Sequence, residues 1–278
     1  YHVLVALLLS DAGHDVRVVN PILAKQYTSG NVRKVKTDPA DARGLARMAQ
    51  VADNLPERFM LDRNTIRLRK KLAMLGSMNH QRQALVASLR SFDELRTTLG
   101  QDTSPAIEVV RTSIKELERA MRALERECVR EVRTDASTQR TLSLLTTIPG
   151  VSEFCGVLAL QWFKILPGST AKSWIAYAGL DVSSRESGTW KGKCKLTKRG
   201  NAFLRRRLYS AAWGATMHNA DFKEYYDRLR VHEGRAHVEA LTIIARKIVR
   251  TMYHVMQSNT VYDPSKFGHK YLSTTTTA

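Results

Sequence analysis

The sequence has few cysteines and no long apolar segment, and each shortage excludes a class of protein. Cys128, Cys155 and Cys194 are scattered without CxxC spacing. They therefore indicate free thiols of a reducing compartment, not a disulfide framework or a zinc site. The apolar stretch from Val3 to Leu9 is too short to span a membrane and has no basic lead-in. We therefore expect neither a signal peptide nor a membrane anchor.

Acidic residues are scarce in the carboxyl-terminal half. The chain has a net charge of +18, and residues 140–278 hold 21 basic but only 9 acidic side chains. This excess favours nucleic acid as the partner over an acidic metabolite or protein. An anionic membrane is the competing polyanion, but the sequence has no lipidation motif and no obvious basic amphipathic helix.

The first 57 residues have an α/β pattern. Residues 1–12 are typical of a helix, Asp15–Asn20 alternates as a strand does, and Pro21 suits the first turn of a short helix. A sheet with a single strand needs partners. We expect these strands upstream of Tyr1, and hence a chain that begins inside a domain.

Residues 58–137 predict a long antiparallel helical hairpin. The return arm carries apolar residues in alternating steps of three and four, a heptad seam: Ile107, Val110, Ile114, Leu117, Met121, Leu124 and Cys128. A hairpin of this kind often pairs with another subunit, so a homo-oligomer, dimer or tetramer, is expected.

Residues 138–262 predict an all-α domain, followed by a disordered tail over 263–278. Two apolar helices flank Ile148-Pro149-Gly150-Val151, a pattern similar to a helix-hairpin-helix, in which Gly150 lets backbone amides approach a phosphate. A plain tight turn between core helices is the alternative. Trp174 and Tyr177 favour the core over base stacking.

Asp38 and Asp41 lie three residues apart where a helix is expected to begin, a helix that runs to about Asp53. One interpretation is helix capping, with Asp38 as the cap. The other is a pair of oxygen ligands for Mg²⁺ in phosphoryl chemistry. The two roles are compatible.

The stretch from Gly179 to Leu208 contains the strongest candidate site. A serine-rich loop with Ser183, Ser184 and Ser187 precedes a run in which eight of seventeen positions, 191–207, are basic and none is acidic. Asn201 then suits the N-cap of a helix. Such a stretch fits a serine nucleophile beside cations that attract a phosphodiester. A solvated basic loop with an incidental serine is the alternative.

Short motifs in family order carry a resemblance to a known family. Near the start they are Val19-Asn20-Pro21 and Lys36-Thr37-Asp38-Pro39-Ala40-Asp41-Ala42. Further on they are Ile148-Pro149-Gly150-Val151, Tyr177-Ala178-Gly179-Leu180, Ser187-Gly188, and Lys198-Arg199-Gly200-Asn201 with Leu204-Arg205. Together they resemble Piv-type DEDD insertion-sequence transposases, whose members are recombinases guided by a structured RNA of the element.

The resemblance implies a mixed, mostly α fold: part of a RuvC-like (RNase H-like) domain over 1–57, the hairpin, and the carboxyl-terminal transposase domain. By position, Ser187 is the nucleophile, and Asp38 and Asp41 are catalytic acids that bind Mg²⁺. The family's first Asp and its Glu are expected before Tyr1. We assign nucleic-acid binding to Gly150, Lys191, Lys193, Lys195, Lys198, Arg199, Asn201, Arg205 and Arg206.

The implied function is DNA strand cleavage and exchange, with DNA and a guide RNA as partners, in the cytoplasm of a prokaryote at the nucleoid. Two alternatives remain. One is a nucleic-acid-binding protein without catalysis, and the other is an inactive transposase remnant.

Overall fold

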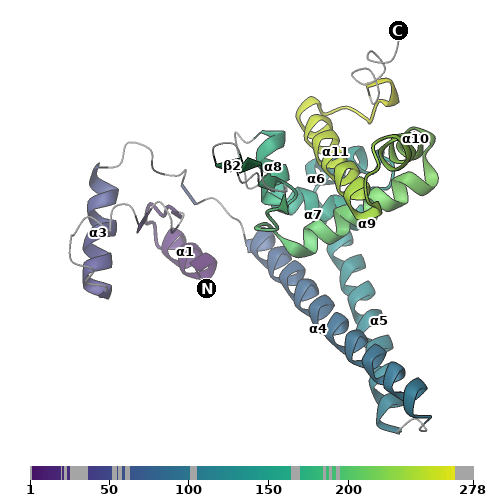
Figure 1. Ribbon diagram of the computed structural model, residues 1–278. Coiled ribbons are helices and arrows are strands. Elements are labelled where there is room, and N and C mark those ends of the chain that lie inside the picture. Colours follow the sequence, from purple (N-terminus) through teal and green to yellow (C-terminus); the bar gives the residue numbers. More distant parts are fainter. Residues whose placement is uncertain are drawn as a thin grey trace. The chain divides into compact units, whose positions relative to one another are not determined.

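The computed structural model describes residues 2–19, 21, 24–25, 37–51, 55, 58–59, 63–100, 105–163, 170–183, 186–187, 190–191 and 195–266 (Figure 1). The chain divides into two compact units, residues 1–67 and 68–278. Within the described residues, no helix combines the length and apolar character that crossing a bilayer requires.

Unit 1 contains helices α1 (His2–Asp11) and α3 (Asp38–Val51). The strand predicted over 15–20 is reduced to one antiparallel bridge between Arg17 and Arg58, where the Phe59 amide donates to the Val16 carbonyl at 2.7 Å. Its extent is limited because no further strand pairs with it among the described residues of this unit. Most of the short helix predicted after Asn20 lies outside the described residues.

Two long helices, α4 (Arg63–Leu99) and α5 (Pro105–Arg133), run antiparallel (Figure 1). Ion pairs join them from one end to the other: Lys71 with Glu127 and Glu131, Arg82 with Glu118, and Asp93 with Arg111. The heptad positions Ile107, Ile114, Met121 and Cys128 are buried, as an apolar seam requires.

The remaining helices of unit 2 surround one apolar core. They are α6 (Ala136–Leu145), α7 (Glu153–Phe163), α8 (Ala171–Tyr177), α9 (Ala202–His218), α10 (Ala220–Asp227), the π-helix η1 (Arg228–His232) and α11 (His237–Ser258). Trp174 is buried in this core, as predicted, and packs edge-on against Tyr253. The base of the α4–α5 hairpin belongs to the same core through Leu72, Leu75 and Cys128.

The prediction of an all-α domain is wrong between α8 and α9, where the chain forms a β-ribbon of four short strands: β1 (Val182–Ser183), β2 (Glu186–Ser187), β3 (Trp190–Lys191) and β4 (Lys195–Leu196). β1 pairs with β4, and β2 with β3, all antiparallel. Strands of two residues show no apolar alternation, which is why the sequence indicated loops.

The predicted disordered tail is also partly wrong. Asp263 accepts hydrogen bonds from the amide and hydroxyl of Ser265 at 3.0 and 2.7 Å, which begins a 3₁₀ turn, η2 (Pro264–Lys266). The preceding Tyr262 amide donates to the Thr147 hydroxyl at 2.9 Å. Residues 267–278 lie outside the described residues.

Candidate functional site

The two ends of the ribbon are joined by a contact between two glycines, which we call the neck (residues 177–181 and 197–201). A Cβ on Gly200 would lie 2.0 Å from the Tyr177 carbonyl oxygen and 2.3 Å from the Gly179 amide nitrogen. Gly179 itself has a φ of +67°, which favours glycine. The backbones therefore approach more closely than any side chain permits, and this accounts for both glycine motifs.

Hydrogen bonds across the neck fix this approach. The Asn201 amide donates to the Tyr177 carbonyl at 3.2 Å, and the Thr197 amide donates to the Asp181 carbonyl at 3.0 Å. The Thr197 hydroxyl also donates to the Asp181 carboxylate. The Asn201 side chain accepts from the Leu204 amide at 2.9 Å and caps α9, which confirms the predicted helix start.

Arg205 closes the neck from α9. Its Nη1 lies 3.2 Å from the Ala178 carbonyl oxygen and 3.5 Å from those of Lys198 and Gly200. These contacts give the guanidinium an internal structural role. Nucleic-acid binding by Arg205 and by the Asn201 side chain stays a prediction beside these internal roles.

Ser187 lies beside the tip of the ribbon. It pairs with Trp190, so only Gly188 and Thr189 separate the two arms there. Lys191 lies in β3 and Lys195 in β4. Lys193, Ser184 and Gly188 lie outside the described residues. The backbone thus places the predicted nucleophile and two of the predicted cations on one narrow element.

Three predicted nucleic-acid contacts are exposed: Lys198, Arg199 and Arg206. Lys198 has a left-handed φ of +53° and lies at the neck. Arg207 differs from its neighbours, because its guanidinium pairs with Glu125 of α5 and lies 5.0 Å from the centre of the Phe154 ring. Burial raises the pKa of Glu125, and Arg207 opposes this shift. Arg207 therefore attaches α9 to the hairpin.

Gly150 lies in the turn between α6 and α7 and packs against α9. It has a φ of +79°, and a Cβ would lie 2.1 Å from the Ala211 carbonyl oxygen. The structure thus explains this glycine as part of a tight turn between core helices, one of the two interpretations of the motif. Phosphate binding at Gly150 stays a prediction.

Asp38 and Asp41 both lie in the first turn of α3. The Ala40 and Asp41 amides donate to the Thr37 carbonyl, each at 3.0 Å, so Thr37 takes the cap position and Asp38 is the first helical residue. The interpretation of Asp38 as the cap is therefore corrected by one residue. Asp38 is exposed and Asp41 half-buried.

The two carboxylates fit a magnesium site in donor chemistry, since both are hard oxygen ligands. They form only part of a ligand set. Among the described residues, no group of three or more His, Cys, Asp or Glu side chains could hold a metal ion.

Sequence reasoning missed a second basic site. The apolar face of α11 was recognised, but Arg246, Lys247 and Arg250 on the same helix were not assigned a role. Arg250 lies four residues after Arg246 and three after Lys247, spacings that bring cations to one side of a helix. This was the signal that could have identified them.

Known protein families match both parts of the chain. A transposase family, DEDD_Tnp_IS110, matches residues 1–103. The family described as "Transposase IS116/IS110/IS902 family" matches residues 142–227, which include the neck and the ribbon.

Individual relatives agree with this assignment. The chain is 28% identical over 125 residues to the "Insertion element IS110 uncharacterized 43.6 kDa protein" of Streptomyces coelicolor. This match covers 43% of the chain and 30% of that protein. The chain is also 26% identical over 257 residues to the "Pilin gene-inverting protein" of Moraxella lacunata. This second match covers 90% of the chain and 75% of the relative. The matched part spans about a third of the length of the insertion-element relatives. The chain belongs to the IS116/IS110/IS902 family of transposases.

Proposed function

We propose that this protein is a DNA transposase or recombinase that cleaves and exchanges DNA strands with Ser187 as its nucleophile. The position of Ser187 carries the proposal: it is paired at the tip of a ribbon whose base is fixed by the neck. An element that projects from a rigid base suits a group that must reach a phosphodiester. The name of the pilin gene-inverting relatives, which denotes rearrangement of DNA, also supports it.

In the proposed reaction, the Ser187 oxygen attacks a DNA phosphorus and the bond from phosphorus to the leaving sugar oxygen breaks. The serine proton passes to a neighbouring base or water, and the leaving oxygen takes up a proton. The phosphoserine link conserves the bond energy for strand exchange. Lys198, Arg199 and Arg206 bind and orient the DNA.

Asp38 and Asp41 are the residues of this chain that would hold Mg²⁺. When bound, Mg²⁺ polarises the phosphate and neutralises developing charge. The carboxylates come from unit 1 and the serine from unit 2, so the proposal places the two roles on different units. Guidance by a structured RNA, and an oligomer formed through the α4–α5 hairpin, belong to the same proposal on family grounds. So do domain boundaries at 57, 137 and 262.

The test is a strand-exchange assay of the full-length protein with DNA carrying the element's ends and RNA from its flanking region. Ser187→Ala should abolish both strand exchange and any covalent protein–DNA species on a denaturing gel, while nucleic-acid binding stays near normal. Ser183→Ala is the matched control, because it removes a hydroxyl from β1 of the same ribbon. An adduct that persists in Ser187→Ala would move the nucleophile elsewhere.

A parallel pair of variants tests the acids. Asp38→Asn and Asp41→Asn should each abolish Mg²⁺-dependent strand exchange with the fold intact, because each loses only the favourable charge in the first turn of α3, about 0.3–1 kcal/mol. Full activity in both would refute metal binding. Nucleic-acid binding without exchange in the wild type would favour a non-catalytic binding protein.

A further inference from the structure

A group of four cations lies on α11 and η1, which we call the α11 cationic cluster: Arg228, Arg246, Lys247 and Arg250. Two of them stack on one ring. The Arg228 guanidinium lies 4.9 Å and the Lys247 ammonium 5.4 Å from the centre of the Tyr225 ring. Because cations are attracted to aromatic faces, Tyr225 holds these two positive groups at a fixed spacing.

The cluster concentrates like charges, three of them in partly buried positions and one, Arg250, exposed. Burial, together with Arg228 and Arg250, lowers the pKa of Lys247. Burial and then Arg250 also lower the pKa of Arg246, against an opposing effect of Asp181 and Tyr225. The Nε of Arg246 is buried and has no hydrogen-bond partner among the described residues. Positive groups gathered in this way are stabilised by an added anion.

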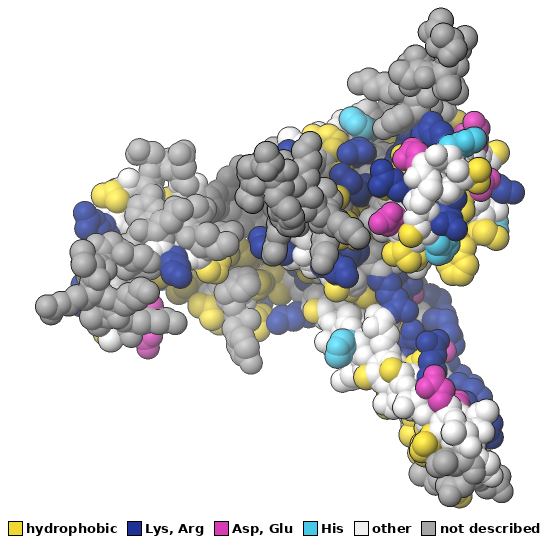
Figure 2. Space-filling model, in the orientation of Figure 1, with side chains coloured by type: hydrophobic (Ala, Val, Ile, Leu, Met, Phe, Trp, Pro, Cys, Tyr) yellow, Lys and Arg dark blue, Asp and Glu magenta, His cyan; other side chains and the backbone are white. Residues whose placement is uncertain are grey.

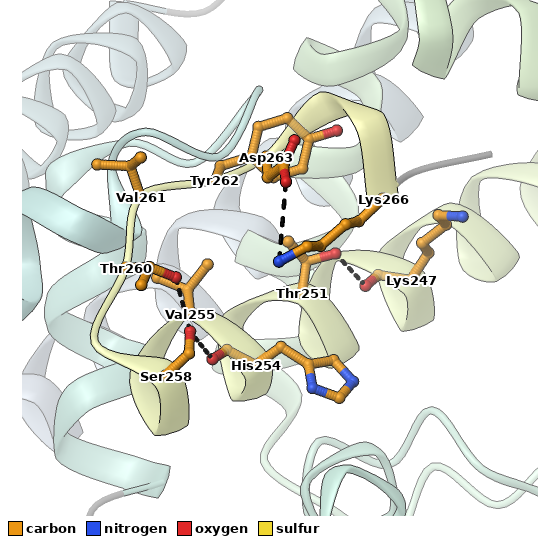
Figure 3. A pocket seen from close by; sticks show the side chains of 10 residues that line it. All are labelled: Lys247, Thr251, His254, Val255, Ser258, Thr260, Val261, Tyr262, Asp263 and Lys266. Carbon is orange, nitrogen blue, oxygen red and sulfur yellow. Dashed lines mark hydrogen bonds and ion pairs between the residues drawn. The ribbon is translucent and has the colours of Figure 1, made fainter. Parts of the chain in front are cut away.

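Space for an anion lies next to Lys247. A pocket of about 310 Å³ lies between the second half of α11 and the segment 260–266, and His254, Lys266 and one acid, Asp263, also line it (Figure 3). Lys266 pairs with Asp263 at 3.7 Å, which leaves Lys247 as the cation of this pocket that belongs to the cluster.

The hydroxyls of Thr251 and Ser258 donate to α11 carbonyls at 3.1 and 2.8 Å. The protons that remain for a ligand are those of the nitrogen groups and of the Tyr262 hydroxyl, which is buried without a hydrogen-bond partner among the described residues.

The helix that carries most of the cluster, α11, packs against α8, which leads into the neck. The Asp181 carboxylate of the neck raises the pKa of Arg246, against the larger lowering by burial and by Arg250, and the Asp181 carbonyl accepts from Thr197 at the foot of the ribbon. Lys and Arg side chains are spread over α9, α10 and α11 on the surface seen in Figure 2.

We propose that the α11 cationic cluster binds a phosphodiester of a nucleic-acid strand held at the ribbon. The proposal rests on the proposed function, which supplies the nucleic acid. Arginine forks match phosphate oxygens, and neutralising them releases counterions from the strand. The same chemistry occurs in DNA and RNA, so the test has an arm for each.

The first experiment compares binding of single-stranded DNA and RNA oligonucleotides by full-length variants over a salt series. Arg246→Gln/Lys247→Gln/Arg250→Gln should weaken binding about tenfold or more and flatten the salt dependence by about two units of log K per log [salt]. The matched control is Lys115→Gln/Arg119→Gln/Arg126→Gln, which removes equal charge from exposed positions on α5. The control should lose less than about threefold.

A second experiment uses the wild-type protein, so it does not depend on a variant that folds. Mild amidination followed by mass spectrometry should show Lys247 protected by bound oligonucleotide and exposed Lys115 unprotected. Protection by DNA alone, or by RNA alone, identifies the source of the phosphodiester.

Equal losses in the cluster and control variants, or no protection of Lys247 by either strand, would overturn the cluster proposal and leave the proposed function standing. A wild-type protein that binds neither strand would overturn both.

Discussion

The neck and the ribbon are consecutive parts of one segment, and they are built on opposite principles. The neck is defined by a glycine–glycine contact, by two amide hydrogen bonds and by the Arg205 guanidinium on three carbonyls. The ribbon consists of four paired positions in strands of two residues.

Stability and reactivity are thus separated along the segment. The neck has little freedom to vary because the Gly200 contact is between backbone atoms. The ribbon carries the proposed nucleophile, and Val182 and Leu196 at its base lie outside the buried core cluster. This division is expected when a reactive group is supported by a rigid base, and each prediction below tests one side of it.

The largest expected effect is at Gly200. Gly200→Ala should destabilise unit 2 by about 4 kcal/mol or prevent folding, because its Cβ would meet backbone atoms that cannot rotate away. Gly234→Ala is the control: Gly234 also has a positive φ, +62°, but nothing lies within 4 Å of its Cβ position. That variant should cost about 1 kcal/mol. Denaturant unfolding measures both free energies. Equal losses would show that the close contact at Gly200 costs no more than the left-handed backbone at Gly234.

Substitutions of the neighbouring residues Arg205 and Arg206 should have different effects on stability and on nucleic-acid binding. Arg205→Ala should lower the free energy of unfolding by about 2 kcal/mol, since hydrogen bonds from a charged group to carbonyls are lost. Arg206→Ala should leave stability within about 0.5 kcal/mol, because the side chain is exposed, and should weaken nucleic-acid binding. Parallel unfolding and binding titrations test this. The reverse pattern would assign nucleic-acid binding to Arg205 and the structural role to Arg206.

Burial of Cys155 in the core should make the free energy of unfolding depend on pH. Burial raises the pKa of Cys155 from 9.0 to about 12. Below pH 9 the thiol is protonated in both states. As pH rises from about 9 to 12, the unfolded chain releases a proton that the folded protein keeps, so stability falls.

The fall should be about 1 kcal/mol per pH unit from this thiol. Cys155→Ala should remove that part of the slope while lowering stability at every pH. The measurement is denaturant unfolding from pH 8 to the highest pH at which unfolding stays reversible. Identical slopes in both proteins would contradict the burial.

The smallest effect on stability is expected from shortening the ribbon. Residues 184–194 replaced by Asn-Gly would join β1 directly to β4 through a two-residue hairpin turn. Because the neck is kept, the free energy of unfolding should change by less than about 1 kcal/mol, while strand exchange is lost. A collapse of unit 2 would show that the ribbon is part of the fold.

Local patterns made the helices predictable from the sequence. The heptad spacing of α5, the Asn201 cap and the helix begun at Thr37-Asp38 each depend on residues within a turn or two of one another. The two-residue strands were missed because serine, glycine and lysine give no apolar alternation.

Contacts between residues far apart in the sequence could not be predicted from such local patterns. The motif around Gly179 and the motif around Gly200 were each recognisable, but only the structure shows that they touch. In the same way, three adjacent arginines are equivalent in sequence, yet Arg205 binds the neck, Arg206 is exposed and Arg207 pairs with Glu125. The roles proposed for Ser187, Asp38 and Asp41 rest on their sequence motifs and on their positions in the chain.

The contact between Gly179 and Gly200 also limits how this segment can evolve. At Gly200 the atoms that would obstruct a new side chain all belong to the main chain, which every residue shares, whereas at Gly179 the nearest obstructing atom is Nη1 of the Arg205 side chain. A second mutation can therefore offer no smaller partner to a side chain at Gly200. In a saturation mutagenesis of the chain, we expect Gly200 to tolerate no substitution and to have no intragenic suppressor, however many substitutions the ribbon accepts.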